Sequence, residues 1–370
     1  MAFDLTARGD VPPFIVMDVL REANAREAAG EGVLHLEVGQ PGSPPPQPVL
    51  DAAKAALDGG PIGYTDALGL PELRRAIAGH YGTAYGIDLD PQRVVVTTGS
   101  SGGFLLSFLA GFAPGARVAL AAPGYPAYRN ILKALDIEPL LLETDLEHRF
   151  QPTPELLDAL DAPPDGLIVA SPSNPAGTML GEEEMRRLAA YCEDAGILLI
   201  SDEIYHGISF GGRAVSALEH SDQAVIVNSF SKYFCMTGWR LGWMVLPERA
   251  VRPVARLAQN LCASAPTVSQ IAGIAAFDCT EAFDRIVAGY RRSRDLLLER
   301  LPAAGIDRLA PADGAFYIYA DVGRLTNDSP EFCRRMLQEI NVAATPGVDF
   351  DPARGSRYLR FSFAGPHKDI

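Results

Sequence analysis

The sequence predicts an α/β protein, with a large domain built on a mainly parallel sheet sandwiched by helices and a smaller α+β domain formed by both termini. Short apolar runs recur between residues 93 and 230, and segments with helical spacing separate most of them. After residue 280 this alternation ends, and a long helical segment precedes two further strand-like segments. These three observations predict the fold class.

The apolar runs are predicted to be buried parallel strands, because both faces of such strands must be apolar. They are RVVVTT (93–98), ARVALAA (116–122), LIVAS (167–171), ILLISDE (197–203) and AVIVNSF (224–230). The helical segments between them include 101–113, 126–135 and 181–196, the last beginning with acids and ending at Gly196. Strands that alternate with helices imply right-handed crossovers and a sheet covered on both faces.

The domain boundaries follow from a proline cluster and from the change of pattern. The cluster GQPGSPPPQP (39–48) is interpreted as a rigid crossing into the large domain. A helix over 281–301 leads to the predicted strands GAFYIYADV (314–322) and RYLRFSFAG (357–365). We expect residues 1–42 to form an N-terminal segment and part of the small domain, 43–285 the large domain, and 286–370 the C-terminal small domain.

The acidic composition argues against binding to nucleic acid or to an anionic membrane. The 32 Lys and Arg residues against 46 Asp and Glu give a net charge of −14 at pH 7, whereas both partners need a basic surface. Any bound phosphate must then be held by a local pocket.

The cysteines and the hydropathy indicate a cytoplasmic protein. The five cysteines form no CxxC pair and are odd in number, so we interpret them as structural thiols in a reducing compartment. The longest apolar stretch, FLLSFLAGFA, is shorter than the roughly 18 residues that span a bilayer. The N-terminus, MAFDLTARGD, lacks the basic and apolar segments of an export signal.

Residues capable of binding and catalysis follow the predicted strands. Ligands of open parallel sheets bind beyond the carboxyl ends of the strands. The residues after the five strands are, in order, Gly99, Ser100, Ser101 and Gly102; Tyr125 and Tyr128; Asn174; Asp202, Glu203 and Tyr205; and Ser229, Ser231 and Lys232. A helix that opens on small residues can bind phosphate through free N–H groups. We therefore expect one site at this edge of the sheet.

Each motif also has a purely structural interpretation. Serines such as Ser100 are common at helix starts. The segment SNPAG around Asn174 is composed mostly of residues that favour turns. Asp202 and His206 have the spacing of a metal-binding pair, but no third ligand lies nearby in the pattern, so we expect no metal site. The occurrence of all these motifs in sheet order favours one functional site.

The stretch NSFSKYFCMTGWRLG (228–242) contains one of only four lysines in the 370 residues. Ser-x-Ser-Lys is followed, eight residues after the lysine, by an arginine with glycines on both sides, at positions Ser229, Ser231, Lys232, Gly238, Arg240 and Gly242. This pattern resembles that of the fold-type I pyridoxal-phosphate (PLP) enzymes, most closely the class I/II aminotransferases related to aspartate aminotransferase. The resemblance extends from LEVGQPG to RYLRFSFA.

The resemblance implies that pyridoxal 5'-phosphate is the cofactor. Lys232 would form the Schiff base and then move the substrate α-proton, for which its pKa must be lowered by partial desolvation and by the nearby Arg240. The phosphate would be bound by Arg240, by Ser229 and by the N–H groups of Ser100 and Ser101. Arginine suits this role because its planar fork matches an anion. Gly102 and Ser231 are further cofactor-binding residues that the resemblance implies.

The resemblance also assigns the groups around the cofactor ring. Asp202 would pair with the pyridine nitrogen, while Asn174 and Tyr205 would donate hydrogen bonds to the phenolic oxygen. Tyr125 would stack on the ring face. Tyr64, in GYTDALGLPELR, would reach the phosphate of a neighbouring subunit, which implies a homodimer with active sites at the interface. The alternative for Tyr64 is a buried aromatic beside a turn.

Substrate binding is assigned to the two ends of the chain. Arg360 matches the arginine that grips the substrate α-carboxylate through two parallel hydrogen bonds. Arg357 is the competitor, but strand alternation places it on the opposite face. Gly39 would approach the same carboxylate as the N-terminal segment closes over the site, with Asn174 beside it. We identify no residue that would bind a side-chain carboxylate.

The resemblance implies ping-pong transamination between an L-amino acid and a 2-oxo acid. A PLP-dependent C–S β-lyase on the same fold is the alternative. A PLP-binding regulatory domain would need a DNA-binding module, and the segment before the proline cluster is too short and not basic enough to supply one. A nicotinamide-dependent dehydrogenase lacks support because no G-x-G-x-x-G follows the first strand.

Overall fold

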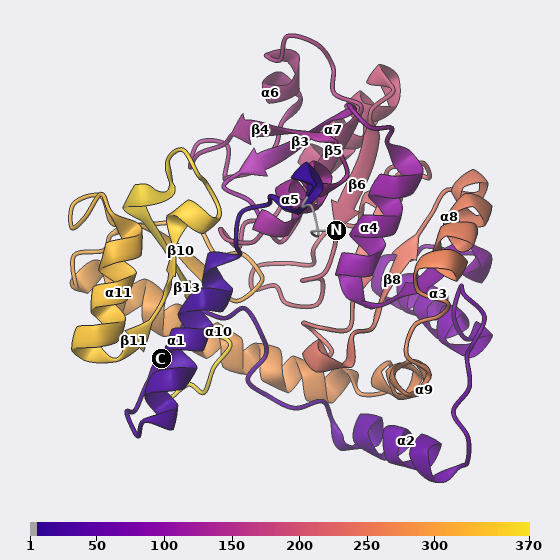
Figure 1. The fold of residues 1–370 in the computed structure, drawn as a ribbon, viewed down its shortest axis with the longest axis horizontal. Coiled ribbons are helices and arrows are strands. Elements are labelled where there is room, and N and C mark those ends of the chain that lie inside the picture. The colour runs from indigo at the N-terminus through magenta and orange to yellow at the C-terminus, as the bar shows by residue number, and fades with distance from the viewer. Residues whose placement is uncertain (1–5) are drawn as a thin grey trace, which may run out of the picture.

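The computed structural model describes residues 6–370, so the first five residues of the expected N-terminal segment lie outside the described residues. A seven-stranded sheet forms the centre of the larger part of the molecule (Figure 1). Its strands lie in the order β2 (Val94–Thr97), β8 (Gly242–Val245), β7 (Val225–Ser229), β6 (Leu198–Asp202), β5 (Gly166–Ala170), β3 (Arg117–Ala122) and β4 (Glu138–Glu143).

Only β8 runs against the other strands of this sheet. It pairs antiparallel with both β2 and β7, and the remaining neighbours pair in parallel. The strands β2, β3, β5, β6 and β7 therefore end at the same edge of the sheet. The α/β class with a mainly parallel sheet is confirmed, as are the five strands expected from the apolar runs.

Two strands of the large sheet were not expected from the sequence. β4 (EPLLLE) is an edge strand with mostly half-exposed or exposed residues, so it lacks the uniform apolar character of a central strand. β8 has four residues and begins with a glycine shortly after the arginine of the lysine motif. Strands this short carry little periodic signal.

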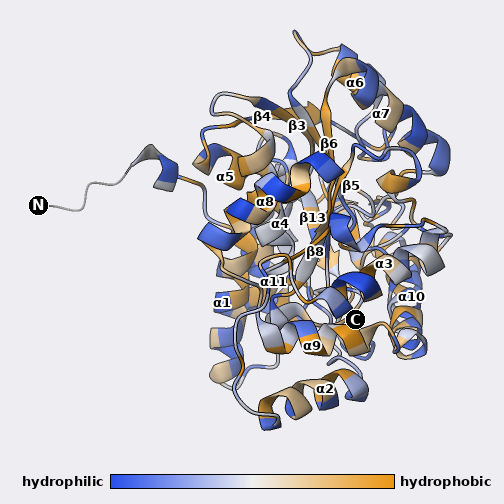
Figure 2. Ribbon diagram, turned by 90° about the vertical axis from the view of Figure 1, so that its right-hand side faces the viewer, coloured by the Kyte–Doolittle hydropathy of each residue, from blue (hydrophilic) through white to orange (hydrophobic). Residues whose placement is uncertain are grey.

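Helices cover both faces of the large sheet and bury two separate cores. Alternate residues of one strand face opposite cores. Val94 and Val96 belong to the core that also contains residues of α2 (Gln47–Asp58), α3 (Pro71–Tyr85), α7 (Glu182–Ala195) and α9 (Thr267–Ala276). Val95 belongs to the core that contains residues of α4 (Gly99–Gly111), α5 (Pro126–Ala134) and α8 (Glu248–Leu261). Apolar colour accordingly concentrates on the strands in Figure 2. The other α-helices of the described residues are α1 (Ile15–Ala28), α6 (Pro154–Asp158), α10 (Thr280–Ala303) and α11 (Ser329–Ile340).

Local sequence sets the ends of these helices. Helix α7 begins with Glu182, Glu183 and Glu184, whose charges favour a helix N-terminus. It ends at Gly196, which has φ of +69° and can adopt this left-handed conformation without a Cβ penalty. The expected end of this helix is therefore confirmed. Among residues 6–370, none of the helices combines the length and the hydropathy that a membrane span requires.

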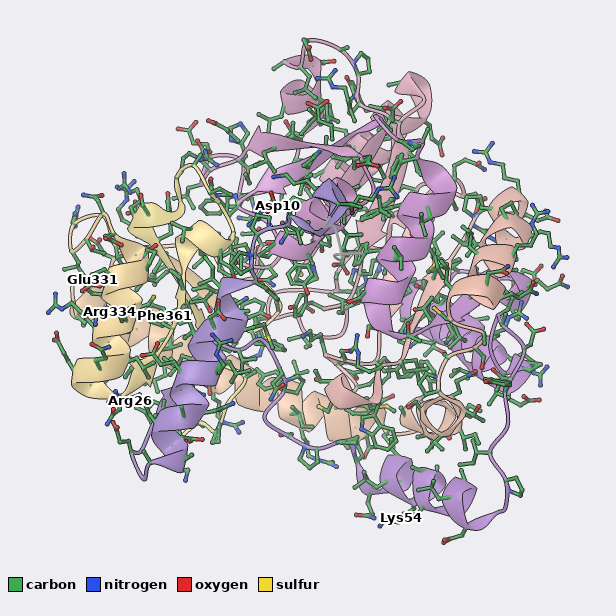
Figure 3. All side chains as sticks on the ribbon, in the orientation of Figure 1. Asp10, Arg26, Lys54, Glu331, Arg334 and Phe361 are labelled. Carbon is green, nitrogen blue, oxygen red and sulfur yellow. The ribbon has the colours of Figure 1, made fainter. Side chains whose placement is uncertain are left out.

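Both chain ends contribute to a second, smaller body. Its four-stranded antiparallel sheet has the order β12 (Thr345–Pro346), β13 (Tyr358–Ser362), β10 (Tyr317–Asp321) and β9 (Arg308–Leu309). Near the N-terminus, β1 (Leu34–His35) pairs with β11 (Val342–Ala343) in parallel. Figure 1 shows α1 lying against these C-terminal elements, and Figure 3 shows the charged Glu331 and Arg334 on the outer side of α11, while Phe361 is buried.

Helix α10 joins the two bodies. Its Phe283 packs in a core of the large sheet, whereas Tyr290 and Leu297 pack in the core of the small sheet. Six short 3-10 helices complete the secondary structure of the described residues: η1 (Ala7–Gly9), η2 (Pro91–Arg93), η3 (Ala217–Glu219), η4 (Thr237–Trp239), η5 (Gly347–Asp349) and η6 (Gly355–Arg357).

Candidate active site

The start of α4 and the guanidinium of Arg240 form a cradle at the sheet edge. Gly242, the first residue of β8, pairs with both Thr97 and Ser229, so the chain that leads into β8 passes beside the start of α4. Thr98 makes no side-chain cap, which leaves backbone N–H groups of the first turn uncapped. Free N–H groups at a positive helix end and a guanidinium suit a phosphate. Ser100, Ser101 and Gly102 lie in this first turn.

Two of the glycines around Arg240 are required by close packing. Gly99 has φ of +76°, and a Cβ there would lie under 3.0 Å from the Arg240 guanidinium. A Cβ on Gly242 would lie 2.7 Å from the Gly99 carbonyl carbon and 2.8 Å from the Asn228 oxygen. Gly238, by contrast, has nothing within 4 Å of its Cβ position. The glycine after Arg240 is therefore a packing requirement, whereas the glycine before it is not.

The two serines of the lysine motif connect to Arg240. Ser229 Oγ donates to Ser231 Oγ at 2.9 Å, and Arg240 Nη1 donates to Ser231 Oγ at 3.4 Å. Arg240 Nη1 also donates to the Thr237 carbonyl at 3.0 Å. These bonds hold one side of the guanidinium while the other side faces Gly99.

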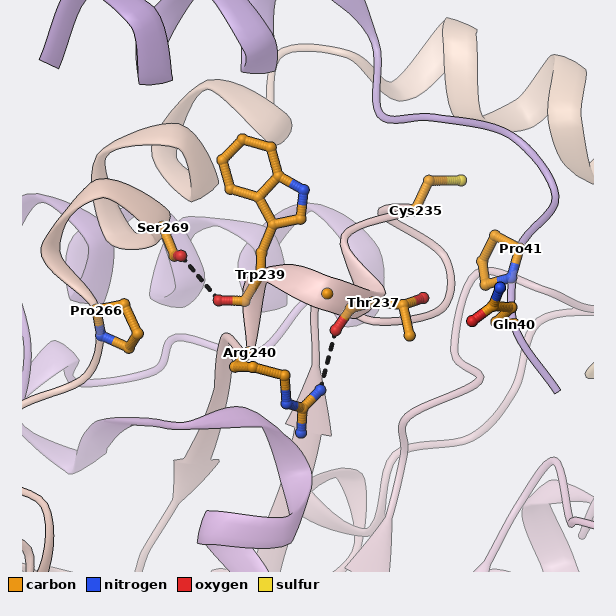
Figure 4. A pocket seen from close by; sticks show the side chains of 9 residues that line it. Gln40, Pro41, Cys235, Thr237, Trp239, Arg240, Pro266 and Ser269 are labelled. Atoms are coloured by element: carbon orange, nitrogen blue, oxygen red, sulfur yellow. Dashed lines mark hydrogen bonds between the residues drawn. The ribbon is translucent and has the colours of Figure 1, made fainter. Parts of the chain in front are cut away.

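A cavity of about 620 Å³ opens beside Arg240. The loop after Lys232 lines one side of it, and Gln40 and Pro41 of the proline-rich crossing line another, as Figure 4 shows. Pro266 and Ser269, at the start of α9, complete the lining. The N-terminal crossing therefore passes over the loop that carries the expected cofactor lysine.

Lys232 lies in an electropositive and largely desolvated position. Its Nζ donates to the Gly39 carbonyl at 2.5 Å and lies 5.9 Å from the centroid of the Tyr205 ring. Burial, together with the charges of Arg360 and Arg240, lowers the pKa of Lys232 to about 8, while Asp202 opposes this shift. An amine with this pKa carries a substantial unprotonated fraction at mildly alkaline pH.

Asp202 is buried at the end of β6. Burial raises the pKa of this carboxyl to about 6, although hydrogen bonds from the Tyr128 hydroxyl and the Ile204 N–H favour the charged form. Tyr128 donates to Oδ2, a role that its position beside Tyr125 in the sequence did not indicate. The carboxylate is therefore held in place by a fixed donor.

Glu203 and His206, which follow Asp202 in the sequence, make hydrogen bonds to residues outside the predicted site set. Glu203 accepts hydrogen bonds from Ser216 Oγ and the Ala217 N–H, and burial raises its pKa to about 8. His206 bonds the Tyr85 hydroxyl through Nδ1 at 2.7 Å and the Ser171 carbonyl through Nε2 at 2.9 Å. Within residues 6–370, no group of three or more His, Cys, Asp or Glu side chains is arranged to hold a metal ion.

Tyr205 and Asn174 each contact a residue of the small sheet. The hydroxyls of Tyr205 and Tyr317 are 2.7 Å apart. Asn174 Oδ1 accepts a hydrogen bond from Arg360 Nη1 at 2.8 Å. Sequence reasoning missed Tyr317, whose only signal was its place in the predicted strand 314–322.

Arg360 is a buried cation without a carboxylate partner. Its Nη2 donates to the Glu37 carbonyl and to Thr345 Oγ1, and its Nε has no hydrogen-bond partner among the described residues. Its Cζ lies 4.4 Å from the centroid of the Tyr317 ring. No carboxylate oxygen of residues 6–370 lies within 4.0 Å of this guanidinium. A buried, unneutralised guanidinium suits an anionic ligand.

The competitor Arg357 is already paired. It binds both oxygens of Asp321, at 2.9 and 2.8 Å, and its side chain is 42% exposed. The structure separates the two arginines, but not by strand alternation: Arg357 is the last residue of η6, whereas Arg360 lies on β13 and is buried.

The aromatic residues occupy different places. Tyr125 is half-buried and contacts Tyr128 and Phe14 edge-on, with ring centroids 5.2 and 5.7 Å away. Phe14, immediately before α1, was not identified from the sequence. Tyr64 is 90% exposed, so the interpretation as a buried aromatic is wrong, and the structure does not bring Tyr64 to the other site residues.

The residues present thus fit pyridoxal phosphate on three counts. An uncapped helix start faces Arg240, a lysine with a lowered pKa lies nearby, and a buried carboxylate is held at the same edge of the sheet.

Comparison with known proteins identifies the family. The sequence pattern of the family described as aminotransferase class I and II matches residues 31–370. The chain is 50% identical over 367 residues to the valine–pyruvate aminotransferase of Mycobacterium tuberculosis, covering 98% of this chain and 95% of the relative. It is 31% identical to the aspartate aminotransferase of Thermotoga maritima, covering 96% of this chain and 93% of that enzyme.

Comparison with solved structures supports the same family. A crystal structure of an aminotransferase from Mycobacterium tuberculosis superposes with a TM-score of 0.97 at 49% identity, covering 100% of this chain and 96% of that one. The aspartate aminotransferase of Thermus thermophilus with maleate gives a TM-score of 0.93 at 30% identity, covering 100% and 97%. The expected fold type, cofactor and amino-group transfer are thereby confirmed. The chain belongs to the class I and II aminotransferases, which are pyridoxal-phosphate enzymes that transfer an amino group between an amino acid and a 2-oxo acid.

Proposed function

We propose that this aminotransferase exchanges the amino group between a neutral, apolar L-amino acid and a small 2-oxo acid such as pyruvate, with Lys232 as the base. One observation carries the proposal. Lys232 Nζ donates to the carbonyl of Gly39, and Arg360 donates to the carbonyl of Glu37, two residues away. The amine and the unneutralised guanidinium therefore face one short segment, where an amino acid could meet both.

The residues around the cofactor ring would act through the contacts described above. Bound pyridoxal phosphate supplies an aldehyde that accepts the amino group and a ring that accepts the electron pair released with the α-proton. Lys232 Nζ would bind the aldehyde carbon and carry the proton. Asp202, fixed by Tyr128, would hold a proton on the ring nitrogen. Tyr205 and Asn174 would donate to the phenolic oxygen, and Tyr125 would cover one face of the ring.

The phosphate would occupy the cradle at the start of α4. Arg240 offers a guanidinium whose Nη1 is already fixed on Thr237 and Ser231. Ser229, Ser231 and the N–H groups of Ser100, Ser101 and Gly102 would supply further hydrogen bonds.

Arg360 would bind the substrate α-carboxylate. The rings of Tyr317 and Phe350 pack against its guanidinium, with Cζ 4.4 and 4.8 Å from their centroids. The carboxylate would neutralise the buried charge, with Gly39 and Asn174 beside it. Bidentate pairing would fix the orientation of the Cα–H bond relative to Lys232.

An apolar donor is supported by the surroundings of Tyr125 and by the relative from Mycobacterium tuberculosis. That enzyme is named for valine and pyruvate. Phe14 packs edge-on against Tyr125, so an apolar side chain borders the proposed ring face. The cations of the proposed site are already assigned: Lys232 and Arg240 to the cofactor, and Arg360 to the α-carboxylate. A carboxylate on the substrate side chain would therefore lose its hydration beside Phe14 without gaining a cationic partner.

We further propose a homodimer with active sites at its interface. Tyr64, Ile62 and Leu261 are exposed by 90%, 43% and 50%. Residues 62–64 adjoin the start of α9, shortly after Leu261, because Thr267 Oγ1 donates to the Gly63 carbonyl at 2.7 Å. This exposed apolar surface suits a partner subunit, in which Tyr64 would reach the phosphate bound by Arg240.

The domain division and the location complete the proposal. We infer that residues 6–42 and 286–370 act as a small domain against residues 43–285, with α10 as the continuous connection. A cytoplasmic location is supported by the five free cysteines, four of which are buried.

The experiment that tests the proposal compares donors in a single half-reaction. Holoenzyme is mixed with valine, alanine or aspartate without an acceptor, and the loss of the visible cofactor band and the 2-oxo acid released are measured. We expect about one equivalent of oxo acid per site, at least roughly tenfold faster with valine than with aspartate. Faster reaction with aspartate would contradict the apolar donor class. Pyruvate and ammonia from a cysteine conjugate, with no transfer from any donor, would favour a β-lyase.

A further inference from the structure

The buried hydroxyl of Tyr317 lies between Tyr205, which follows strand β6, and Gly39 of the N-terminal crossing. Tyr317 is 1% exposed, and its Oη lies 2.7 Å from the hydroxyl of Tyr205. A Cβ on Gly39 would lie under 3.0 Å from the same Oη, so Gly39 leaves room for this hydroxyl. Gly39 is also the residue whose carbonyl accepts from Lys232.

The ring of Tyr317 supports Arg360. In the antiparallel pair of β10 and β13, Arg360 lies directly opposite Tyr319, and Tyr317 is two residues along the same face. Diagonal neighbours on one face are within reach of aromatic and long side chains. The guanidinium of Arg360 accordingly lies 4.4 Å from the centroid of the Tyr317 ring.

We propose that Tyr317 is a positioning residue of the transamination site, whose hydroxyl donates to Tyr205 and directs the Tyr205 proton toward the phenolic oxygen of the cofactor, while its ring holds Arg360. This inference rests on the role proposed for Tyr205.

The direction of the hydrogen bond follows from the number of protons. Each hydroxyl has one proton to donate. If Tyr205 donates to the cofactor oxygen, the bond between the two tyrosines can form only with Tyr317 as the donor. Accepting this bond makes the Tyr205 hydroxyl a stronger donor, because hydrogen bonds in a chain polarise one another. A stronger donor favours the anionic form of the phenolic oxygen and lowers the pH at which the cofactor band titrates.

The same strand provides a matched control. Tyr319 is also 1% exposed and lies on β10 two residues from Tyr317, but its hydroxyl has no hydrogen-bond partner among residues 6–370. Tyr319→Phe therefore deletes an equally buried hydroxyl without removing a hydrogen bond. Tyr317→Phe removes only the hydroxyl and leaves the ring against Arg360.

The test measures the pH midpoint of the visible band in purified holoenzymes, together with kcat and KM for valine. Tyr317→Phe should raise the midpoint by about 0.5 to 1 pH unit and lower kcat roughly three- to tenfold. KM should change little, because the ring remains under Arg360. Tyr317→Leu, which removes the ring, should raise KM as well. Tyr319→Phe should match the wild type in all of these measurements.

A double-mutant cycle shows whether Tyr317 acts through Tyr205. Tyr205→Phe should raise the midpoint, and adding Tyr317→Phe should raise it no further. An unchanged midpoint in Tyr317→Phe, with a shifted midpoint in Tyr205→Phe, would overturn this inference and leave the proposed role of Tyr205 intact. An unchanged midpoint in Tyr205→Phe would overturn the role of Tyr205 itself. Equal shifts of the pH midpoint in Tyr317→Phe and Tyr319→Phe would show that the loss of any buried hydroxyl on β10 has this effect, and would also overturn the inference.

Discussion

The guanidinium of Arg240 occupies the space that a side chain at Gly99 would fill. Gly99 has φ of +76°, and a Cβ there would lie under 3.0 Å from this guanidinium. The first residue of α4 and the arginine after the cofactor lysine, 141 positions apart in the sequence, are therefore in direct contact.

Gly99→Ala should weaken pyridoxal-phosphate binding. The methyl group would displace Arg240 from the uncapped start of α4 and strain a left-handed backbone position. Loss of one charge-assisted contact predicts about a tenfold to hundredfold higher Kd. Titration of the apoprotein with the cofactor measures this change. Gly238→Ala is the control, because its Cβ position has nothing within 4 Å. Equal affinities of the two variants would contradict the proposed cradle.

Cofactor capture by the apoprotein should depend on pH with a midpoint near 8. Burial lowers the pKa of Lys232 from 10.5 to about 8, with Arg360 and Arg240 as further causes. Since the unprotonated amine attacks the aldehyde, the rate of appearance of the visible band should rise with pH and level off above this midpoint. Stopped-flow absorbance over pH 6 to 11 gives the profile. A rate that still rises steeply above pH 10 would show an unperturbed lysine.

The same shift predicts how this group affects the stability of the apoprotein. The folded-state pKa of Lys232 lies below the unfolded value, so the unfolded chain binds more protons between about pH 8 and 10.5. The contribution of this group to the free energy of unfolding therefore increases as pH rises through that window. Lys232→Met should remove this part of the pH dependence in denaturant titrations at pH 8 and 10.5.

Arg360→Lys should raise KM for the amino acid about tenfold to hundredfold, because a lysine ammonium cannot reproduce the bidentate fork. Arg357→Lys is the matched control, because Arg357 lies just before β13, at the end of η6. It breaks a partly exposed pair with Asp321 and should cost no more than about 1 kcal/mol of stability, with KM unchanged. Steady-state kinetics with valine separates the two. A larger KM change in Arg357→Lys would reverse the assignment of the carboxylate-binding arginine.

Two inactive variants should complement each other if the active sites lie at a dimer interface. Tyr64→Ala would damage the site of the partner subunit, whereas Lys232→Ala would damage the site of its own chain. A dimer of one chain of each variant therefore retains one intact site, which combines Lys232 of the first chain with Tyr64 of the second. Random exchange of equal amounts should restore up to about a quarter of the wild-type activity. Mixing Lys232→Ala with Asp202→Ala provides the control, because both residues belong to one chain's site and the mixed dimer then has no intact site. Absence of recovery in the first mixture would contradict the role of Tyr64.

The parts of the fold and site that the sequence could predict are those set by local patterns. Continuous apolar runs identify the central strands because both of their faces are buried, as the alternating cores of Val95 and Val96 show. The residues after these strands, such as Asp202 and Lys232, could be assigned to one edge because parallel strands end together.

The remaining features depend on contacts between segments far apart in the chain. Tyr317 meets Tyr205 only because β10 carries it from the small sheet to the edge of the large one. Phe14 reaches Tyr125 from a segment more than a hundred residues away. The difference between Gly242 and Gly238 is equally invisible in the sequence, because both flank Arg240 but only Gly242 is packed against backbone atoms.

The proposed activity depends most directly on Lys232, as the amine that binds the cofactor and moves the substrate α-proton. The most direct measurement is the absorption spectrum of wild type and Lys232→Ala, each with one equivalent of pyridoxal phosphate, before and after addition of valine. The wild type should show a visible band that valine discharges with release of its 2-oxo acid, and Lys232→Ala should transfer the amino group at least about a hundredfold more slowly. Amino transfer by Lys232→Ala at the wild-type rate would contradict this role of Lys232.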